Sequence, residues 1–369
     1  MNHNFLTPGP VNVPRKVRAA MTIEPPYFAS KSFGRLLNAI QPRLQWLFQT
    51  SQPVMIGTGS GTMGMEAAVK NFTNIGDRVL VITSGKYGNA WDSISQAYHG
   101  TRVTTIKVPQ PAQLSDIERV YDELRLQLSD KKVYYKAVFM THVETTTAFM
   151  LQPGIVKDII EDCNSPALLI LDAVSTLGVM SVTPDLYDVV VSASQKGLQC
   201  PPGLFFMSCS DKAIDRARRT IRSLYYFDVI TELERVNKGQ TSHTPAAHLF
   251  YPLYTALKEM CRRYPNVYEL FEHCADLRSA TLDTAKERRI PVWQTSPPVT
   301  AFKCFDQNAQ AIQQSMKKNG WWVGTGVRGH EHDLIRTMHF GWDTSPDFIV
   351  EGIHLLADMF DDNRRVIVS

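Results

Sequence analysis

The chain has 369 residues, of which 44% are hydrophobic and 20% charged, and these proportions are ordinary for a globular protein with a large core. The 39 basic and 36 acidic side chains are spread along the sequence, so no basic block predicts nucleic-acid binding. The six cysteines form no C-x-x-C pair, the histidines lack zinc-ligand spacing, and no apolar run approaches the roughly 20 residues that cross a bilayer. We therefore expect a soluble, cytoplasmic protein with reduced thiols, no metal site and no membrane contact.

Short β-rich runs alternate with helical stretches between about residues 53 and 210, which is typical of strands joined by crossover helices. This pattern predicts an α/β fold with a mostly parallel, seven-stranded sheet sandwiched by helices, and ligands bound beyond the carboxyl ends of its strands. The expected strands are 53–56, 78–82, 102–106, 136–140, 167–171, 188–191 and 204–207, and the expected helices are 63–72, 114–128 and 154–163.

The remaining sequence predicts a smaller second domain and an irregular N-terminus. Helical spacing dominates 213–223, 245–263 and 267–288, and mixed strand and helix follow Pro291. Five prolines between Pro8 and Pro26 argue against a regular element there, so we expect this stretch to wrap another part of the molecule. The expected parts are an N-terminal segment (1–20) that contributes to the active site and the small domain, a large domain (21–265) and a small C-terminal α/β domain (266–369).

A glycine-rich turn, 57–64, joins the first strand to the next helix. Glycines at such a junction let backbone N–H groups approach an anion at the positive helix end, and Ser60 and Thr62 add hydroxyl donors. The spacing Gly59-x-Gly61-x-x-Gly64 also matches a dinucleotide-binding fingerprint. That alternative requires an acidic residue after the second strand, whereas Asp77 lies before it. A third interpretation is a tight turn without a ligand.

An acid and a lysine follow two neighbouring strands of the expected sheet. Asp172 ends an apolar run, where a buried carboxylate needs a partner, although read alone it is better explained as a turn cap. Lys196 lies among small residues, where desolvation would lower its pKa and supply a neutral amine. Pyridoxal 5′-phosphate (PLP) enzymes need such an amine, an acid for the pyridine nitrogen and donors for the phosphate. Lys196, Asp172 and the glycine-rich turn together supply all three.

In this context the chain resembles the class V aminotransferases of the fold type I PLP-dependent enzymes, especially the alanine- or serine–glyoxylate aminotransferases. The resemblance covers nearly the whole chain and implies PLP as cofactor, a homodimer with shared active sites, and amino transfer from alanine or serine to glyoxylate or pyruvate. The segments that carry it, in the family's order, are 7–10, 59–62, 65–67, 85–88, 142–147, 172–178, 194–196, 201–203, 243–245 and 336–341.

The resemblance also implies roles for individual residues. Lys196 would form the Schiff base with PLP and act as acid and base, and Asp172 would contact the pyridine nitrogen. Tyr87 would stack over the cofactor ring, although alone it is equally a half-buried core tyrosine. Arg336 would bind the substrate carboxylate, against the alternative of a surface ion pair. The other implied contacts are Ser60, Gly61 and Thr62 with the phosphate, Gln195 and Thr145 with polar groups of the cofactor, Thr244 with the phosphate in the neighbouring subunit, and Gly9 with the substrate.

Several departures from the family pattern leave the substrate open. Residues 27–33 lack the His-Arg pair of many members, Thr241 stands where some relatives have tyrosine, and Ala148 replaces a glycine. The threonines 145–147 are also similar to those of 2-aminoethylphosphonate–pyruvate transaminases. A PLP-dependent lyase or desulfurase is another alternative, but Cys200 and Cys304 lack an evident electropositive setting. A relative that binds PLP without turnover is the last alternative.

Overall fold

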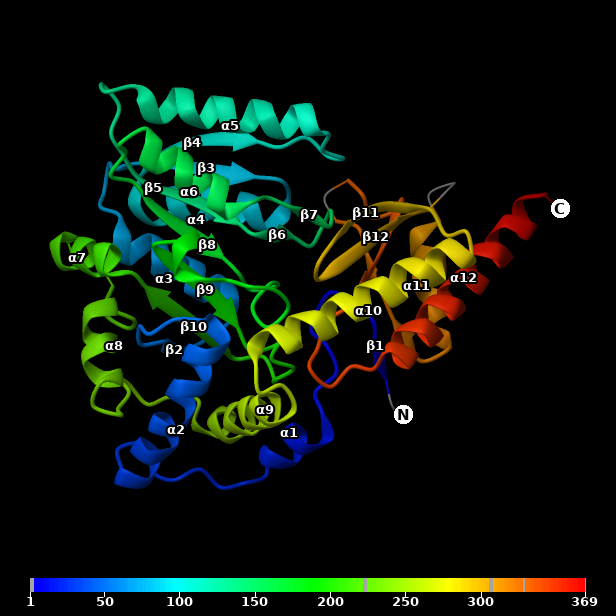
Figure 1. The fold of residues 1–369 in the computed structure, drawn as a ribbon, viewed down its shortest axis with the longest axis horizontal. Helices are drawn as coiled ribbons and strands as arrows, with labels where there is room; N and C mark the ends of the chain where they lie inside the picture. The colour runs from blue at the N-terminus through cyan, green and yellow to red at the C-terminus, as the bar shows by residue number, and fades with distance from the viewer. Residues whose placement is uncertain (1–2, 222–223, 305–307, 328, 369) are drawn as a thin grey trace.

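A seven-stranded sheet forms the centre of the larger part of the computed structural model, which describes residues 3–221, 224–304, 308–327 and 329–368 (Figure 1). Strand β10 is antiparallel to both of its neighbours, and every other pair is parallel. The remaining six strands of this described sheet therefore point the same way, and the expected mostly parallel sheet is confirmed. Across the sheet the order is β2 (Met55–Thr58), β10 (Leu204–Cys209), β9 (Val189–Ala193), β8 (Leu168–Asp172), β5 (Tyr135–Thr141), β3 (Arg78–Thr83) and β4 (Arg102–Lys107).

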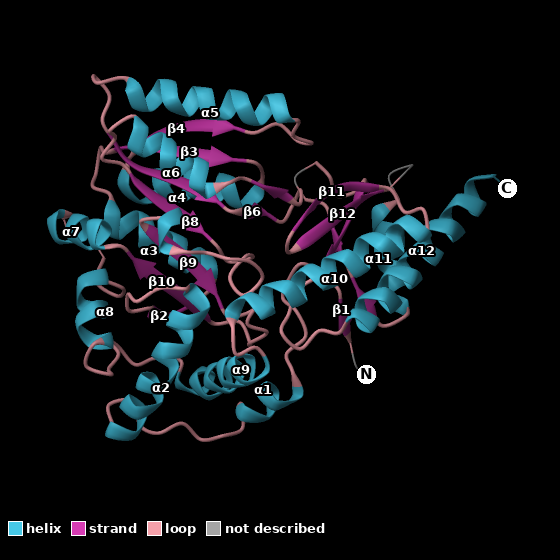
Figure 2. Ribbon diagram, viewed as in Figure 1, coloured by secondary structure: helices cyan, strands magenta, loops and turns pink. Residues whose placement is uncertain are grey.

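Helices cover both faces of this sheet (Figure 2). Successive side chains of a strand point to opposite faces, and in β3 Leu80 and Ile82 join one buried cluster while Val79 and Val81 join another. Covering both faces explains why these strands read as continuous apolar runs. The first cluster includes α2 (Lys31–Phe48), α5 (Leu114–Ser129), α6 (Pro153–Asp162) and α9 (Phe250–Arg263), and the second includes α3 (Gly61–Phe72), α4 (Lys86–His99), α7 (Asp211–Arg219) and α8 (Val229–Val236).

The C-terminal part contains a four-stranded antiparallel sheet with helices against it. Its strands are β11 (Val292–Ser296), β12 (Val299–Lys303), β15 (Leu334–Met338) and β14 (Gly324–Thr325), and its helices are α10 (Val267–Glu287), α11 (Ala309–Lys318) and α12 (Pro346–Val368). Strand β1 (Asn4–Phe5) pairs with β13 (Trp321–Trp322), so the start of the N-terminal segment lies against the C-terminal part (Figure 1).

The N-terminal stretch is more regular than its prolines predicted. Helix α1 (Arg15–Ala20) begins directly after Pro14, a position where a missing N–H costs nothing because the first turn has no acceptor for it. Helix α4 was not anticipated, since its first turn contains a glycine and an asparagine and lacks acidic residues. The helix expected over 213–223 ends at Arg219, and residues 222–223 lie outside the described residues. No described helix has the length and apolar character of a transmembrane span.

Candidate active site

The residues predicted to bind PLP converge at the carboxyl edge of the large sheet. Lys196 follows β9, Asp172 ends β8, and β8 and β9 are neighbours, so the two side chains meet across adjacent strands. The glycine-rich turn joins the same edge because β2 runs in the same direction as β9. One pocket collects these side chains, and its lining consists of Ser60, Gly61, Thr62, Met65, Tyr87, Thr141, Val143, Asp172, Val174, Ser175, Gln195 and Lys196.

Lys196 is buried against the N-terminal segment. Its side chain is 8% exposed, and Nζ donates a hydrogen bond to the backbone carbonyl of Pro8. Burial lowers the pKa of Lys196 to about 8, helped by the charge of Arg336 and opposed by Asp172 and Glu144. A substantial fraction of this amine is therefore neutral near physiological pH, which is the form that attacks an aldehyde.

Gly9 has a φ of +129° and lies directly on the lysine. A Cβ atom built at this position would be 2.5 Å from Lys196 Nζ and 2.6 Å from Cε. Both the backbone conformation and the close approach therefore require glycine. The structure places Gly9 beside the amine, whereas the resemblance implied a contact with the substrate.

Asp172 is a buried carboxylate with two hydrogen-bond donors. Oδ1 accepts from the backbone N–H of Val174 at 2.9 Å, and Oδ2 accepts from the hydroxyl of Thr141 at 3.3 Å. Burial raises the pKa of Asp172 to about 6, with Glu144 acting in the same direction, while the two donors and Lys196 oppose the rise. A carboxyl group with this pKa can share a proton with a pyridine nitrogen, which is the role PLP requires.

The glycine-rich turn and Gln195 present polar groups for which the described residues supply no hydrogen-bond partner. Ser60 is the N-cap of α3, yet its side chain makes no capping hydrogen bond, and Ser60 and Thr62 are exposed. Gln195 Oε1 is buried and has no hydrogen-bond partner among the described residues. An anion at the helix start and a polar ligand beside Gln195 would satisfy these groups, so the pocket fits PLP.

Glu144 is a central residue that the sequence interpretation did not single out. Its carboxylate is 1% exposed and accepts hydrogen bonds from the backbone N–H groups of Tyr87 at 2.8 Å and Gly88 at 3.2 Å. The other oxygen accepts from the Thr146 N–H at 3.1 Å and hydroxyl at 2.7 Å. Glu144 thus caps α4 and holds Tyr87 at the pocket wall. The only signal in the sequence was its place within the segment 142–147.

Arg336 lies beside the pocket and links the C-terminal sheet to the backbone of Thr145. Arg336 belongs to β15. Its Nε donates to the backbone carbonyl of Thr325 at 2.8 Å, and its Nη1 donates to the backbone carbonyl of Thr145 at 2.6 Å. No carboxylate of the described chain lies within 4 Å of this guanidinium, so the alternative of a surface ion pair is wrong. Thr145 therefore meets Arg336 through its carbonyl, and it does not line the pocket.

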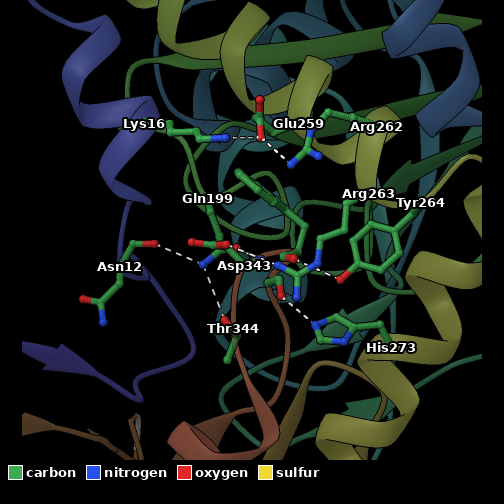
Figure 3. A network of polar contacts seen from close by, with 12 residues as sticks. Asn12, Lys16, Gln199, Glu259, Arg262, Arg263, Tyr264, His273, Asp343 and Thr344 are labelled. Carbon is green, nitrogen blue, oxygen red and sulfur yellow. Dashed lines mark hydrogen bonds and ion pairs between the residues drawn. The ribbon is translucent and has the colours of Figure 1, made fainter.

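The loop after Lys196 is clamped between distant segments (Figure 3). Gln199 is 3% exposed, its Nε2 donates to the carbonyl of Asn12 at 3.2 Å, and its Oε1 accepts from the N–H of Asp343 at 2.8 Å. Leu198 adds a carbonyl that accepts from Trp342 Nε1 at 2.9 Å. The N-terminal segment and the turn after β15 therefore hold the lysine loop from two sides.

Thr244, like Thr145, is a predicted cofactor contact that the structure does not bring into the pocket lining. It is exposed and does not contribute to the lining. Two residues later, the N–H of Ala246 donates to the hydroxyl of Thr58 at 3.1 Å, which ties this segment to the strand before the glycine-rich turn.

Comparisons with known proteins identify relatives over most of the chain. The chain is 33% identical to a protein named soluble hydrogenase small subunit from Synechococcus sp. (strain PCC 6716), over 94% of this chain and 90% of that protein. It is 31% identical to the L-aspartate–glyoxylate aminotransferase of Paracoccus denitrificans, over 90% and 85%. It is 29% identical to the serine–glyoxylate aminotransferase of Methylorubrum extorquens, over 86% and 77%. No protein-family model matches the chain.

A solved structure supports the same fold. The aspartate aminotransferase of Thermus thermophilus superposes with a TM-score of 0.85 at 24% identity, over 97% of this chain and 99% of that one. The chain belongs to the class V aminotransferase family of fold type I PLP-dependent enzymes. It is a PLP-dependent aminotransferase.

Proposed function

We propose that the protein transfers the amino group of a small amino acid, alanine or serine, to a 2-oxo acid such as glyoxylate or pyruvate. The observation that carries this proposal is the half-buried guanidinium of Arg336, which has no described carboxylate within 4 Å and lies close enough to Lys196 for its charge to lower the pKa of that amine. A planar guanidinium is the natural bidentate partner of a carboxylate that both substrates carry. Relatives named for glyoxylate as acceptor support the same choice.

Each predicted residue has a role in this proposal. Lys196 holds the cofactor and moves the substrate Cα proton on Nζ, and Asp172 holds a proton at the pyridine nitrogen. When bound, PLP would supply a ring that can delocalise the electron pair left on Cα after Lys196 removes the Cα proton. Tyr87 packs on the ring, and Arg336 orients the carboxylate so that the Cα–H bond faces Nζ. The remaining proposed contacts are Ser60, Gly61 and Thr62 with the phosphate, Gln195 and Thr145 with polar groups of the cofactor, and Gly9 with the lysine and the substrate.

The thiols argue against the desulfurase alternative. Cys200 and Cys304 are 3% and 2% exposed, and burial raises the pKa of both, that of Cys304 to about 12. A sulfur-transfer enzyme needs an accessible thiolate, which neither residue supplies. A 2-aminoethylphosphonate donor remains the second candidate, because Arg336 would then bind the acceptor alone.

We further propose a cytoplasmic homodimer in which Thr244 reaches the phosphate in the neighbouring subunit. Its exposed position supports this, as does the side chain of Tyr225, which is 88% exposed and has its ring 5.4 Å from that of His243, the residue before Thr244. All six cysteines are free, as in a reducing compartment. The proposed domain division, 1–20, 21–265 and 266–369, places the boundary just before α10. Light scattering of the purified protein tests the dimer, and a monomeric active enzyme would contradict it.

The function is tested by a donor screen in single-turnover mode, with alanine, serine, aspartate and 2-aminoethylphosphonate. We expect alanine or serine to bleach the visible band of the bound cofactor, and glyoxylate or pyruvate to restore it. Lys196→Ala should abolish this cycle, while the exposed control Lys132→Ala should retain it. Arg336→Lys should raise the KM for the 2-oxo acid about tenfold or more, because an ammonium lacks the planar pair of N–H donors that binds both oxygens of a carboxylate.

Two outcomes would contradict the proposal. A protein that acquires no visible band with PLP would exclude the cofactor role of this pocket. A band that bleaches only with 2-aminoethylphosphonate would favour the second candidate. Hydrogen-dependent dye reduction is measured in parallel, because one relative is named for a hydrogenase.

A further inference from the structure

A second pocket opens at the opposite edge of the large sheet, where the strands begin. Tyr134 and Lys136 lie at the start of β5, Asp77 precedes β3, and Pro166 lies shortly before β8. The cavity is about 470 Å³, within the range of small-molecule sites. Since the cofactor pocket occupies the carboxyl edge, this cavity is a separate feature of the fold. Residues of α7 line it. Helix α7 lies at the end of the sheet away from α10 and α12 (Figure 1).

Four cationic side chains converge on this pocket. Lys212, Arg216 and Arg219 are spaced four and three residues apart in α7, so they share one face of the helix, and Lys136 adds a charge from the sheet. Among the residues that line the pocket, Asp77 is the one acid, and one of its oxygens already accepts the N–H of Asn74 at 2.8 Å. The lining therefore carries a strong excess of positive charge.

Hydrogen bonds fix these cations without neutralising them. Arg216 donates from Nη1 to the carbonyl of Lys136 at 3.2 Å and from Nη2 to that of Pro166 at 3.1 Å. Lys212 Nζ lies 3.7 Å from the carboxylate of Asp188, but that carboxylate lies closer, at 2.8 Å, to Lys157. Lys136, Arg216 and Arg219 have no described carboxylate within 4 Å. Three charges at this pocket thus lack a counter-ion within the described chain.

We propose that this pocket binds a small anion that carries two or more phosphate groups. Arginine and lysine donors around one cavity suit phosphate oxygens, and three uncompensated charges match an anion of similar charge. A compact ligand is favoured over a nucleic-acid strand because the cations line a cavity and the formal charge of the whole chain is only +3. Bound there, the anion joins α7 to the starts of β5 and β8.

The proposal is tested by titrating inorganic pyrophosphate into the PLP-saturated protein in a calorimeter at low salt. We expect saturable binding that weakens as salt is added. Arg219→Gln and Lys136→Gln should each weaken it about tenfold, the usual effect of one charged hydrogen bond. The matched control is Arg218→Gln, since Arg218 follows in the same helix turn and pairs with Asp215 at 3.1 Å instead of lining the pocket.

In the same samples, the absorbance of bound PLP shows whether the cofactor pocket is intact. The visible band of PLP should stay unchanged in all three variants, which shows that they are folded and that the anion does not displace the cofactor. Absence of saturable heat would overturn the proposal, as would equal weakening by Arg218→Gln. Tighter binding of citrate or of a short oligonucleotide than of pyrophosphate would also overturn it, because the ligand would then belong to another class.

Discussion

The carboxylate of Glu144 accepts a hydrogen bond from the backbone N–H of Tyr87 at 2.8 Å. A residue of a β-hairpin therefore positions Tyr87, the residue proposed to pack on the cofactor ring. The hairpin consists of β6 (Val143–Glu144) and β7 (Phe149–Met150). Gly85, the N-cap of α4, has no side chain to offer, and a Cβ there would lie 2.7 Å from the Glu144 carboxyl carbon. Burial, followed by the charge of Glu144, raises the pKa of Tyr87, so the phenol stays protonated.

Replacing Glu144 with glutamine should therefore affect both structure and titration. Both carboxylate oxygens of Glu144 accept hydrogen bonds, and glutamine replaces one of them with an NH₂ group that can only donate. We therefore expect a loss of about 1–3 kcal/mol in the free energy of unfolding. Because the charge of Glu144 raises the pKa of Lys196, its removal should also move the titration of that lysine to lower pH. The exposed control Glu123→Gln should change neither quantity. Destabilisation with an unmoved titration would mean that Glu144 acts only as a cap.

The buried amine of Lys196 makes cofactor attachment depend on pH. Since its pKa in the cofactor-free protein is about 8, below the ordinary value of 10.5, Nζ is protonated and unreactive at pH 6. The rate at which the visible band forms should rise about tenfold per pH unit up to about pH 7.5 and level off above pH 8. Arg336→Gln should shift this curve to higher pH, because the charge of Arg336 lowers the pKa of the lysine. A rate that still rises between pH 9 and 10 would show an ordinary, solvated lysine.

Gly9→Ala should separate close contact from backbone strain. A methyl group at Gly9 meets Lys196 Nζ, whereas Gly320 has a φ of +80° with no atom within 4 Å of an added Cβ. Gly9→Ala and the control Gly320→Ala should each lose about 1 kcal/mol or more of stability, because alanine is strained at a positive φ. Only Gly9→Ala should also slow formation of the cofactor band. Thermal unfolding and stopped-flow absorbance measure the two effects, and equal band formation in both variants would exclude contact between Gly9 and the lysine.

Residues that are placed by their own strand could be predicted from the sequence, and residues placed by distant partners could not. Asp172 and Lys196 follow apolar runs that form strands for local reasons, and parallel strands bring their ends together. Glu144 accepts the N–H of Tyr87, which precedes it by 57 residues, and Gln199 donates to Asn12 across 187 residues. Neither partnership leaves a periodic signal in the chain. Helix α1 was not predicted because the prolines of the N-terminal stretch argue against a regular element, whereas Pro14 stands directly before the first turn, where proline is tolerated.

Asp172→Asn should stabilise the cofactor-free protein while it impairs the enzyme. The folded pKa of Asp172 is about 6 and its ordinary value 3.8, so the folded state binds more protons between these pH values and stability from this group falls as pH rises. The penalty is complete above pH 6 and absent below about pH 4. Asparagine retains an oxygen for the N–H of Val174 and removes the buried charge. At pH 7 we expect a gain of about 1–3 kcal/mol by urea unfolding, which vanishes near pH 4.

The same substitution should have the opposite effect once the cofactor is present. An amide cannot hold a proton at the pyridine nitrogen, so Asp172→Asn should lower kcat by about a hundredfold or more, the usual contribution of a positioned acid or base. The exposed control Asp283→Asn should leave both the stability at pH 7 and kcat unchanged. If cofactor-free Asp172→Asn protein is instead less stable than the parent at pH 7, the prediction is wrong. The contacts of the Asp172 carboxylate would then stabilise the fold by more than the burial of its charge destabilises it.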